Sequence, residues 1–346
     1  MLRWLWRGFL LLVLVFVIWF VLVPQFSEAR LALLSLNHLS APLLALGVAL
    51  ELASIASYSL LSRVTLNPSG RPRYFTILRI DVATQGVNNS VPGGGPTSTA
   101  VKYRMLTLAG THAANAVVGT TVEIATSVLT LGGLFGISLA ASVAVVHGNP
   151  EYVVAGVVVG GVAVLSLLAV ILLSRRRERT LGLVRRASRW IPYLSPDLSV
   201  SFVGMVADQL DEYRTRRGRI VMAVAMAGVN WLLDVAALWI FLRAFGFSED
   251  PRHLLVAYSL ACLVGLLPIT PGGLGIIEGV LVPTIVGFGT PQGLALLGVL
   301  TWRLAQYWLP MPLAILAYAS LRAGPLRRSA EPQRSAIVDP SGVSGV

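Results

Sequence analysis

The sequence is short of charged residues, cysteine and histidine, and each shortage excludes a class of protein. Charged residues make up only 12% of the chain, about half the share of a typical water-soluble domain. The single cysteine, Cys262, excludes a disulfide framework and any cysteine-rich metal site. The four histidines are scattered without an HExxH or paired spacing, so neither a metal centre nor a cofactor is expected.

Apolar residues dominate what is present. Hydrophobic residues account for 55% of the 346 positions, and the mean hydropathy is +0.75, so most of the surface is expected to face lipid. The net charge of +11 does not indicate nucleic-acid binding, because the basic residues lie between apolar runs. The residues outside the apolar runs are too few for a soluble catalytic domain. They contain no recognisable set of a nucleophile, a base and a residue that orients the base. We therefore do not expect an enzyme.

Six apolar segments are long enough to cross a bilayer as helices. They are expected at about 2–23, 42–61, 111–146, 152–173, 220–242 and 293–321, with Gly132-Gly133 as a candidate break in the third. The first of them also resembles a cleavable signal peptide, because basic residues lie at its start and a loose cleavage-site pattern follows it.

Two further apolar segments, 75–110 and 254–288, are each interrupted at the middle by Pro-Gly-Gly. The interruptions are Pro92-Gly93-Gly94 and Pro271-Gly272-Gly273. Each arm is too short to cross hydrocarbon at 1.5 Å per residue. Both segments are therefore predicted to be re-entrant hairpins.

The arginines predict the orientation. With both termini in the cytoplasm, most of the 27 basic residues fall in inner segments, and only Arg30 and Arg252 fall in outer loops. The long inner loop 174–219 is rich in arginine and serves either as a topology anchor or as a surface segment on anionic headgroups. The polar tail 329–346 is expected to be disordered.

The two hairpins belong to an internal repeat of opposite orientation. Repeat 1 covers about 41–147 and repeat 2 about 220–321, and the first hairpin enters from the cytoplasm whereas the second enters from outside. The predicted fold is thus an all-α polytopic bundle forming one membrane domain over 1–328, built like many secondary transporters. Free N–H groups and helix dipoles at the two tips favour an anion.

Ionisable residues within the apolar segments are the main site candidates. An ionised group at the bilayer centre costs about 2.5 to 3.5 kcal/mol on insertion scales, so these groups either lock helices as buried ion pairs or line a translocation path. They are Glu51, Asp81, Glu123, Asp234, Glu278, Arg79 and Arg303. Lys102 and Arg104 are expected to reach the cytoplasmic interface, and Arg243 to mark the outer end of 220–242.

Three stretches resemble the lysylphosphatidylglycerol synthase transmembrane-region family, also called flippase-like membrane proteins. They are LPITPGGLGIIEG (267–279), RLAQYWLP (303–310) and NSVPGG (89–94), and Glu123 lies where the family often has a glutamate. The first repeat departs from the pattern, with GPTS at 95–98 and without an aspartate near Thr126 and Ser127. The resemblance covers about 5–325. It implies a bacterial inner-membrane protein corresponding to the membrane half of relatives that also carry an aminoacyl transferase.

These features predict a translocator of a phospholipid or lipid-linked envelope intermediate, working by alternating access, with anionic membrane lipids as partners. The substrate-binding candidates are Asn88, Asn89, Pro92, Gly93, Gly94, Pro271, Gly272, Gly273, Glu278, Arg303 and Tyr307; the proton or ion-pair candidates are Glu51, Asp81, Glu123 and Asp234. Two alternatives stay open. One is a non-transporting membrane scaffold or regulator of a cell-envelope synthase, such as a lipid-modifying enzyme, that acts through 174–219, and the other is a small-solute or ion transporter.

Overall fold

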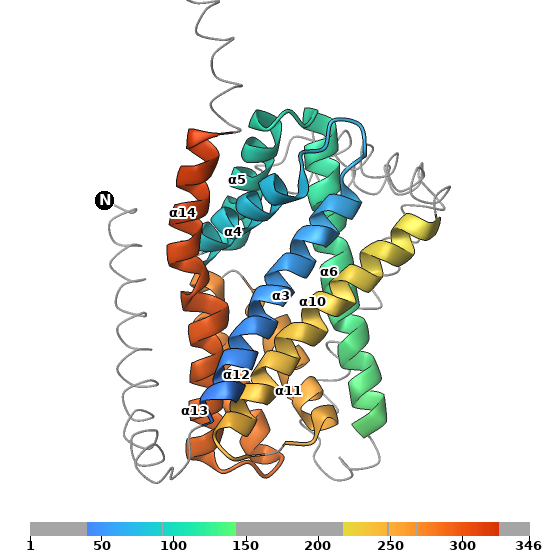
Figure 1. The fold of residues 1–346 in the computed structure, drawn as a ribbon. Helices are drawn as coiled ribbons and strands as arrows, with labels where there is room; N and C mark the ends of the chain where they lie inside the picture. The colour runs from blue at the N-terminus through green and yellow to red at the C-terminus, as the bar shows by residue number, and fades with distance from the viewer. Residues whose placement is uncertain (1–39, 92, 143–216, 248, 268, 325–346) are drawn as a thin grey trace, which may run out of the picture.

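The computed structural model describes residues 40–91, 93–142, 217–247, 249–267 and 269–324, and every regular element in these ranges is a helix (Figure 1). Four helices are long and apolar enough to cross a membrane: Ala41–Thr65, Ala113–Leu139, Gly218–Ala244 and Gln292–Ala323. The all-helical prediction is confirmed. The expected spans 2–23 and 152–173, nearly all of the basic loop, and the tail lie outside the described residues.

Both halves of the described chain have the same order of elements. A long helix is followed by two short helices around a Pro-Gly-Gly break and then by another long helical segment. The first half contains α3 (Ala41–Thr65), α4 (Tyr74–Ser90), α5 (Gly94–Leu108) and α6 (Ala113–Ser142). The second half contains α10 (Arg217–Ala244), α11 (Pro251–Gly265), the 3-10 turn η2 (Pro271–Gly273), α12 (Ile276–Gly287), α13 (Gln292–Arg303), the π-helical turn η3 (Leu304–Trp308) and α14 (Pro310–Ala323).

The candidate break at Gly132-Gly133 is wrong, because α6 continues through both residues. Neither glycine has a positive φ, and no proline lies nearby to remove a hydrogen bond. Glycine alone costs a helix about 1 kcal/mol relative to alanine. A long apolar helix tolerates that cost, so glycine without proline does not end it.

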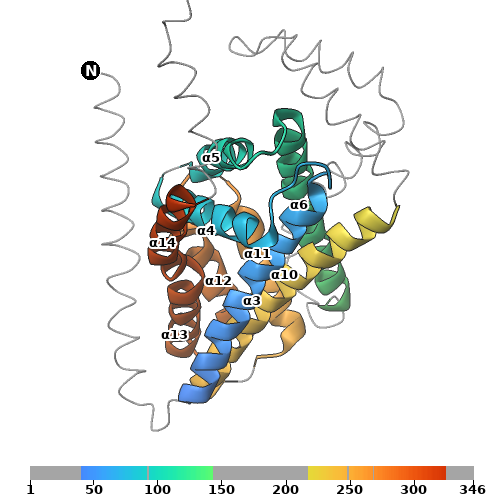
Figure 2. The ribbon, with the colours of Figure 1, turned by 45° about the horizontal axis from the view of Figure 1, so that its top comes forward.

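Helices α3 and α10 lie side by side and antiparallel (Figure 2). At one end the Ser40 N–H donates to the Ala244 carbonyl at 3.4 Å. At the other end Arg219, in the first turn of α10, donates to the Leu66 carbonyl at 2.8 Å. The first long helices of the two halves therefore run in opposite directions.

Small and polar side chains let α3 and α10 approach closely. A side chain at Gly47 would place its Cβ 2.5 Å from the Phe241 ring, so only glycine fits there. Two turns further along, the Asn230 Nδ2 donates to the Ser54 hydroxyl at 2.8 Å and to its carbonyl at 3.1 Å. Between these two contacts α3 carries Glu51 on its buried side.

Each short-helix pair packs partly on the other half of the chain. Helix α4 lies against α14, where Gly86 has no side chain and a Cβ there would lie 2.3 Å from that of Ala314. Helix α11 lies against α6. The two halves are thus interlocked rather than merely adjacent.

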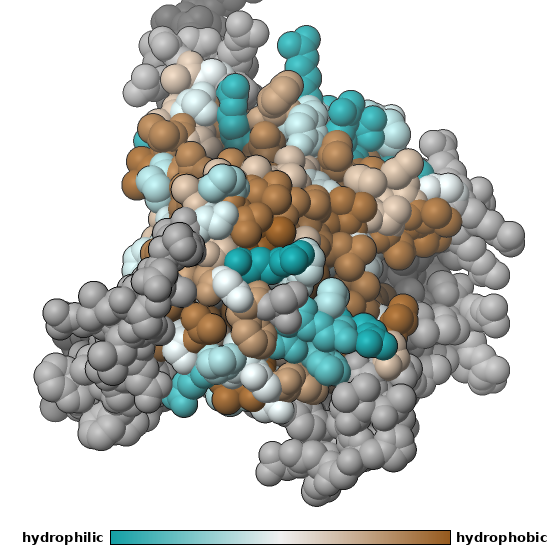
Figure 3. Space-filling view, turned by 60° about the horizontal axis from the view of Figure 1, so that its bottom comes forward, coloured by the Kyte–Doolittle hydropathy of each residue, from teal (hydrophilic) through white to brown (hydrophobic). Residues whose placement is uncertain are grey.

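Apolar side chains cover most of the described surface seen in Figure 3. Ile137, Val221 and Ile315 are 69%, 68% and 71% exposed, although each lies on one of the four long apolar helices. Contiguous exposed apolar surface of this extent is what a lipid-facing bundle presents.

Arginines gather at the end of the bundle where α3 ends and α10 begins. Arg71 donates to the Arg63 carbonyl at 3.1 Å and lies near Arg219.

The opposite end of the bundle carries a conventional helix cap. The Asp250 carboxylate accepts the Arg252 N–H at 2.9 Å and its guanidinium at 2.8 Å. The side-chain hydrogen bond from Arg252 lowers the pKa of Asp250 to about 2. The carboxylate therefore keeps capping α11 down to strongly acidic pH, and its contribution to stability is lost only as the pH falls through that value.

Candidate functional site

The two Pro-Gly-Gly sites break the helices where the sequence predicts. Between α4 and α5, Gly93 has a φ of 66°, and a Cβ on Gly94 would lie 2.3 Å from the Asn88 carbonyl oxygen. In η2, Gly272 and Gly273 have φ values of 51° and 70°. Only glycine takes up such a backbone without strain. Pro92 lies outside the described residues.

The first break meets the second half of the chain through two reciprocal hydrogen bonds. The Asn89 Nδ2 donates to the Tyr307 carbonyl at 2.9 Å, and the Tyr307 hydroxyl donates to the Asn89 carbonyl at 2.6 Å. A Cβ on Gly272 would lie 2.8 Å from both the Asn89 Oδ1 and the Tyr307 ring. The end of α4, η2 and η3 therefore converge at one point, which we call the tip junction (Asn89, Gly272 and Tyr307).

Arg303 holds the second break in place beside the tip junction. Its Nε donates to Glu278 Oε1 at 2.6 Å and its Nη2 to the Gly272 carbonyl at 3.2 Å, while its Nη1 donates to the Gln306 side chain at 2.7 Å. Its guanidinium also lies 4.9 Å from the centre of the Tyr307 ring. Although charged, Arg303 is only 2% exposed.

Glu278 is satisfied at both carboxylate oxygens. One accepts from Arg303, and the other accepts the Gly275 N–H at 2.7 Å at the start of α12. The positive end of the helix dipole adds to the stabilisation of this charge. Because Glu278 neutralises Arg303, the pair can stay buried without net charge.

Within the part of the chain that the structure describes, Arg303 has more N–H groups than hydrogen-bond acceptors. A guanidinium has five N–H groups, and the three acceptors named above use three of them. Planar guanidinium groups suit bidentate binding of phosphate or carboxylate. The guanidinium is thus of a chemical type that suits an anionic group, and Gly272 and Tyr307 form its immediate surroundings.

The π-helical turn that carries Tyr307 is not predicted from the sequence. It is closed by the Leu309 N–H, which donates to the Leu304 carbonyl at 2.9 Å. Pro310 follows directly and lacks the N–H that would continue an α-helical ladder. That proline is the signal that could have indicated an irregular turn, and such turns are frequent at functional sites.

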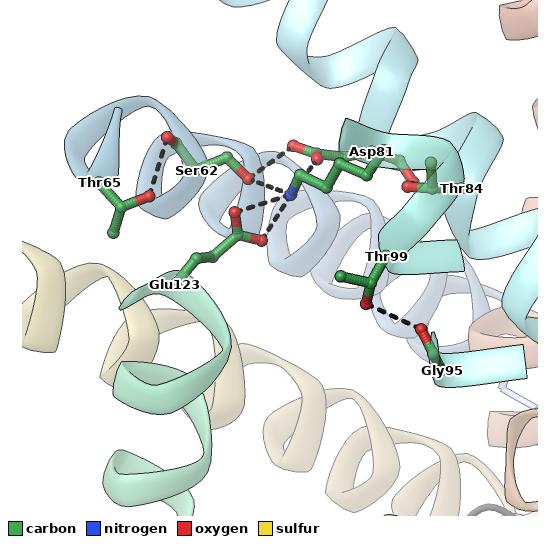
Figure 4. Close-up of polar contacts among 8 residues, drawn as sticks. Ser62, Thr65, Asp81, Thr84, Gly95, Thr99 and Glu123 are labelled. Atoms are coloured by element: carbon green, nitrogen blue, oxygen red, sulfur yellow. Dashed lines mark hydrogen bonds and ion pairs between the residues drawn. The ribbon is translucent and has the colours of Figure 1, made fainter. Parts of the chain in front are cut away.

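A second buried cluster centres on Lys102, and it corrects the expectation that Lys102 reaches the cytoplasmic interface. The lysine is 5% exposed. Its Nζ lies 2.7 Å from Asp81 and 2.6 Å from Glu123, and it donates to the Ser62 hydroxyl at 2.9 Å (Figure 4). From the sequence no cation in the first half was expected to pair with Asp81 or Glu123, and Lys102 is that cation. Arg104, in contrast, is exposed as expected.

The Lys102 and Arg303 clusters occupy equivalent places in the two halves with the charges exchanged. Lys102 on α5 pairs with Glu123 on α6, and Glu278 on α12 pairs with Arg303 on α13. In each half an ion pair therefore joins the second short helix to the long helix after it. Among the described residues, no hydrogen bond or ion pair links one cluster directly to the other.

The remaining two acids come together at the crossing of α3 and α10. The carboxyl groups of Glu51 and Asp234 lie close enough to each other to interact directly. The Trp302 indole donates to Asp234 Oδ1 at 2.6 Å, and the Tyr258 hydroxyl donates to Oδ2 at 2.7 Å. This acid pair (Glu51 and Asp234) adjoins the Arg303 site, because Trp302 precedes Arg303 in the chain.

Three other candidates lie apart from these clusters. Arg79 is exposed. Asn88 is half-buried and contacts only the neighbouring Asn89 through its side chain, at 3.4 Å. Arg243 is in the last turn of α10, as predicted, with its guanidinium 4.5 Å from the Trp239 ring centre. Within the described ranges, no group of three potential metal ligands is found.

The family comparison agrees with the motifs at the tip junction. The profile of the lysylphosphatidylglycerol synthase transmembrane region matches residues 8–314. The chain belongs to this family. It is therefore an integral membrane protein with several apolar helices. Both Pro-Gly-Gly breaks and all three buried clusters fall inside the matched region.

Curated relatives are similar over shorter stretches. A UPF0104 membrane protein of Methanothermobacter thermautotrophicus is 33% identical over 87 residues, covering 25% of each chain. The inner membrane protein YbhN of Escherichia coli K12 is 26% identical over 98 residues, 28% of this chain and 30% of YbhN. A UPF0104 membrane protein of Methanocaldococcus jannaschii is 26% identical over 106 residues, 30% of this chain and 32% of the relative. The chain thus spans less than a third of the length of these relatives.

Proposed function

We propose that the protein moves a phospholipid or a lipid-linked envelope intermediate across the bacterial inner membrane by alternating access. In this proposal the bundle has about six full spans, and α4–α5 and α11–α12 are re-entrant hairpins that enter from opposite sides. Both termini lie in the cytoplasm, because arginines gather at the end where α3 finishes.

The course of the chain supports the opposed hairpins. Helices α3 and α10 are antiparallel, so α4 begins at the arginine-rich end of the bundle and α11 at the other (Figure 1). Each short-helix pair returns to the end of the bundle from which it started (Figure 1). Two units of opposite orientation around one site are the usual plan of secondary transporters.

The tip junction is the observation that carries the proposal. Irregular backbone survives at membrane depth only beside protein or water, and here two helix breaks from different halves lie against each other next to a buried arginine. A static structural element does not need a guanidinium with spare donors at that position. An anionic lipid headgroup would use those donors.

The contacts also indicate what has to change during transport. The reciprocal Asn89–Tyr307 hydrogen bonds join the two halves directly. If one half rocks against the other, these hydrogen bonds would break in one of the two access states and form again in the other. The Arg303–Glu278 pair lies wholly within the second half and would move as a unit.

A leaflet-translocation assay in liposomes tests the proposal. The purified protein is reconstituted with fluorescent phosphatidylglycerol, and the fraction that becomes accessible to a membrane-impermeant quencher is followed over time. We expect Arg303→Ala to slow translocation at least about tenfold, since hydrogen bonds to a charged group are each worth about 1.5 to 3 kcal/mol. Arg252→Ala, which removes an exposed arginine, should behave like wild type.

A second variant separates a lost site from a misfolded protein. Tyr307→Phe removes only the hydroxyl that donates to the Asn89 carbonyl and keeps the ring beside Arg303. It should slow translocation while the thermal unfolding midpoint changes little. If wild-type protein accelerates the crossing of no anionic lipid, or if Arg303→Ala is as fast as wild type, the proposal is wrong.

A further inference from the structure

The acid pair at the crossing of α3 and α10 has no cation of its own among the described residues. Glu51 and Asp234 are 2% and 6% exposed. Among the described residues, no lysine, arginine or histidine forms a hydrogen bond or ion pair with either carboxyl group. Arg303 acts on them only through space, because its donors are directed to Glu278, Gln306 and Gly272.

The two carboxyl groups are not equivalent. Both oxygens of Asp234 accept hydrogen bonds from neutral donors, the Trp302 indole and the Tyr258 hydroxyl. In the described ranges Glu51 has no such donor, and its buried Oε2 has no hydrogen-bond partner there. Asp234 is therefore built to hold a negative charge, whereas Glu51 is not.

A hydrogen bond between two carboxyl groups requires a proton on one of them. Two ionised carboxylates in contact in an apolar interior would repel each other, and each would carry a desolvation cost of several kcal/mol. The other ionisable or charged groups facing the pair do not supply the missing charge. The Tyr258 hydroxyl and the Cys262 thiol on α11 are neutral, and Arg303 on α13 is already neutralised by Glu278.

We propose that Glu51 and Asp234 form a proton-binding site, in which Glu51 carries the proton and donates it to a charged Asp234. A sodium ion does not suit this arrangement, since the described residues contain no group of three or more potential metal ligands. Hard cations need about six oxygen ligands, and the described part of the site offers too few.

The position of the site indicates its use, which rests on the proposed function. Glu51 belongs to the first half and Asp234 to the second, so separation of α3 from α10 breaks their hydrogen bond. Glu51 then releases its proton to water on the side that has opened, and it takes one up from the other side when the halves rock back. Trp302, whose indole donates to Asp234, directly precedes Arg303 in the chain. This connection links the protonation of the acid pair to the headgroup site at Arg303.

Infrared difference spectroscopy of the purified full-length protein in phosphatidylglycerol liposomes tests the proton site without any need for transport. At neutral pH the wild type should show a buried protonated-carboxyl C=O band, and one component of it should be absent in Glu51→Gln. Any component from Asp81 or Glu123 should remain. Glu249→Gln, a change at a buried acid outside the pair, should leave the Glu51 component intact. A wild-type spectrum in which Glu51→Gln removes nothing would overturn the inference.

A pH gradient across the same liposomes tests the coupling. The rate at which wild-type protein translocates fluorescent phosphatidylglycerol should depend on the direction of the gradient, and Glu51→Gln should lose that dependence. Translocation indifferent to the gradient in wild type would contradict coupling. If the Glu51 band is present but no lipid crosses, the proton site stands and the proposed function fails.

Discussion

Lys102 illustrates what a buried charge demands of its surroundings. It is held by Asp81, Glu123 and the Ser62 hydroxyl, and the Tyr58 ring centre lies 5.2 Å from its ammonium group. From the sequence alone, a lysine on a short and weakly apolar helix looks like an interfacial residue. The clue was charge balance, because the apolar segments of the first half contain three acids, and few basic residues near them could balance that charge.

Loss of that lysine should destabilise the protein strongly. Lys102→Met leaves Asp81 and Glu123 buried side by side without a cation, and breaking one partner of a buried pair costs about 3 to 5 kcal/mol. We expect a clearly lower midpoint of thermal unfolding in detergent. Adding Asp81→Asn and Glu123→Gln to Lys102→Met should recover much of the loss, since no uncompensated charge then remains.

Arg104→Met provides the matched control for this prediction. Arg104 lies two residues further along the same helix and is exposed, so its removal should move the unfolding midpoint little. An equal effect of Lys102→Met and Arg104→Met would mean that the Lys102 cluster contributes nothing to stability.

At the scale of elements, the helix breaks depend on proline and glycine acting together. The sequence predicts the breaks at Gly93 and Gly272, where positive φ angles are observed, but it also suggested one at Gly132-Gly133, where the helix is continuous. The π-helical turn before Pro310 could not be located, because its register depends on contacts with α4 that lie far away in the sequence.

Gly272→Ala should damage the tip junction. The new methyl group would lie 2.8 Å from the Asn89 Oδ1 and from the Tyr307 ring, and the φ of 51° disfavours alanine. Strain of this kind costs about 1 to 3 kcal/mol. We expect slower lipid translocation in liposomes together with a lower unfolding midpoint.

Gly133→Ala is the corresponding control, because a Cβ at Gly133 meets nothing within 4 Å and the residue lies inside a helix. Its unfolding midpoint should rise slightly, by the equivalent of about 0.5 to 1 kcal/mol, with unchanged translocation. Normal translocation by Gly272→Ala would show that the tips do not need to meet closely.

At the scale of the whole molecule, the sequence predicts the order of helices and breaks but not which charges meet. Arg303 could have paired with any of Glu51, Glu123, Asp234 or Glu278, and the structure selects Glu278. That choice follows from the packing of α12 on α13. Likewise, Glu51 meets Asp234 only because small residues set the register of α3 on α10. Such registers are tertiary and have no signature in a single sequence.

The proposed transport depends on two hairpins that enter the membrane from opposite sides and return. Cys262 is the only cysteine in the sequence, so after Cys262→Ser a single cysteine can be placed at each exposed position flanking the hairpins. These positions are Ser69 and His112 around the first, and Arg252 and Gln292 around the second. A membrane-impermeant thiol reagent is applied to inside-out and right-side-out vesicles, and labelling is measured by mass spectrometry.

This labelling experiment is the most direct test. If the hairpins are opposed, cysteines at 69 and 112 will react only from the cytoplasmic side, and those at 252 and 292 only from the outside. Labelling of 69 and 112 from opposite sides of the membrane would show that α4 and α5 together make one ordinary span, and it would contradict the opposed-hairpin architecture on which the proposed transport depends.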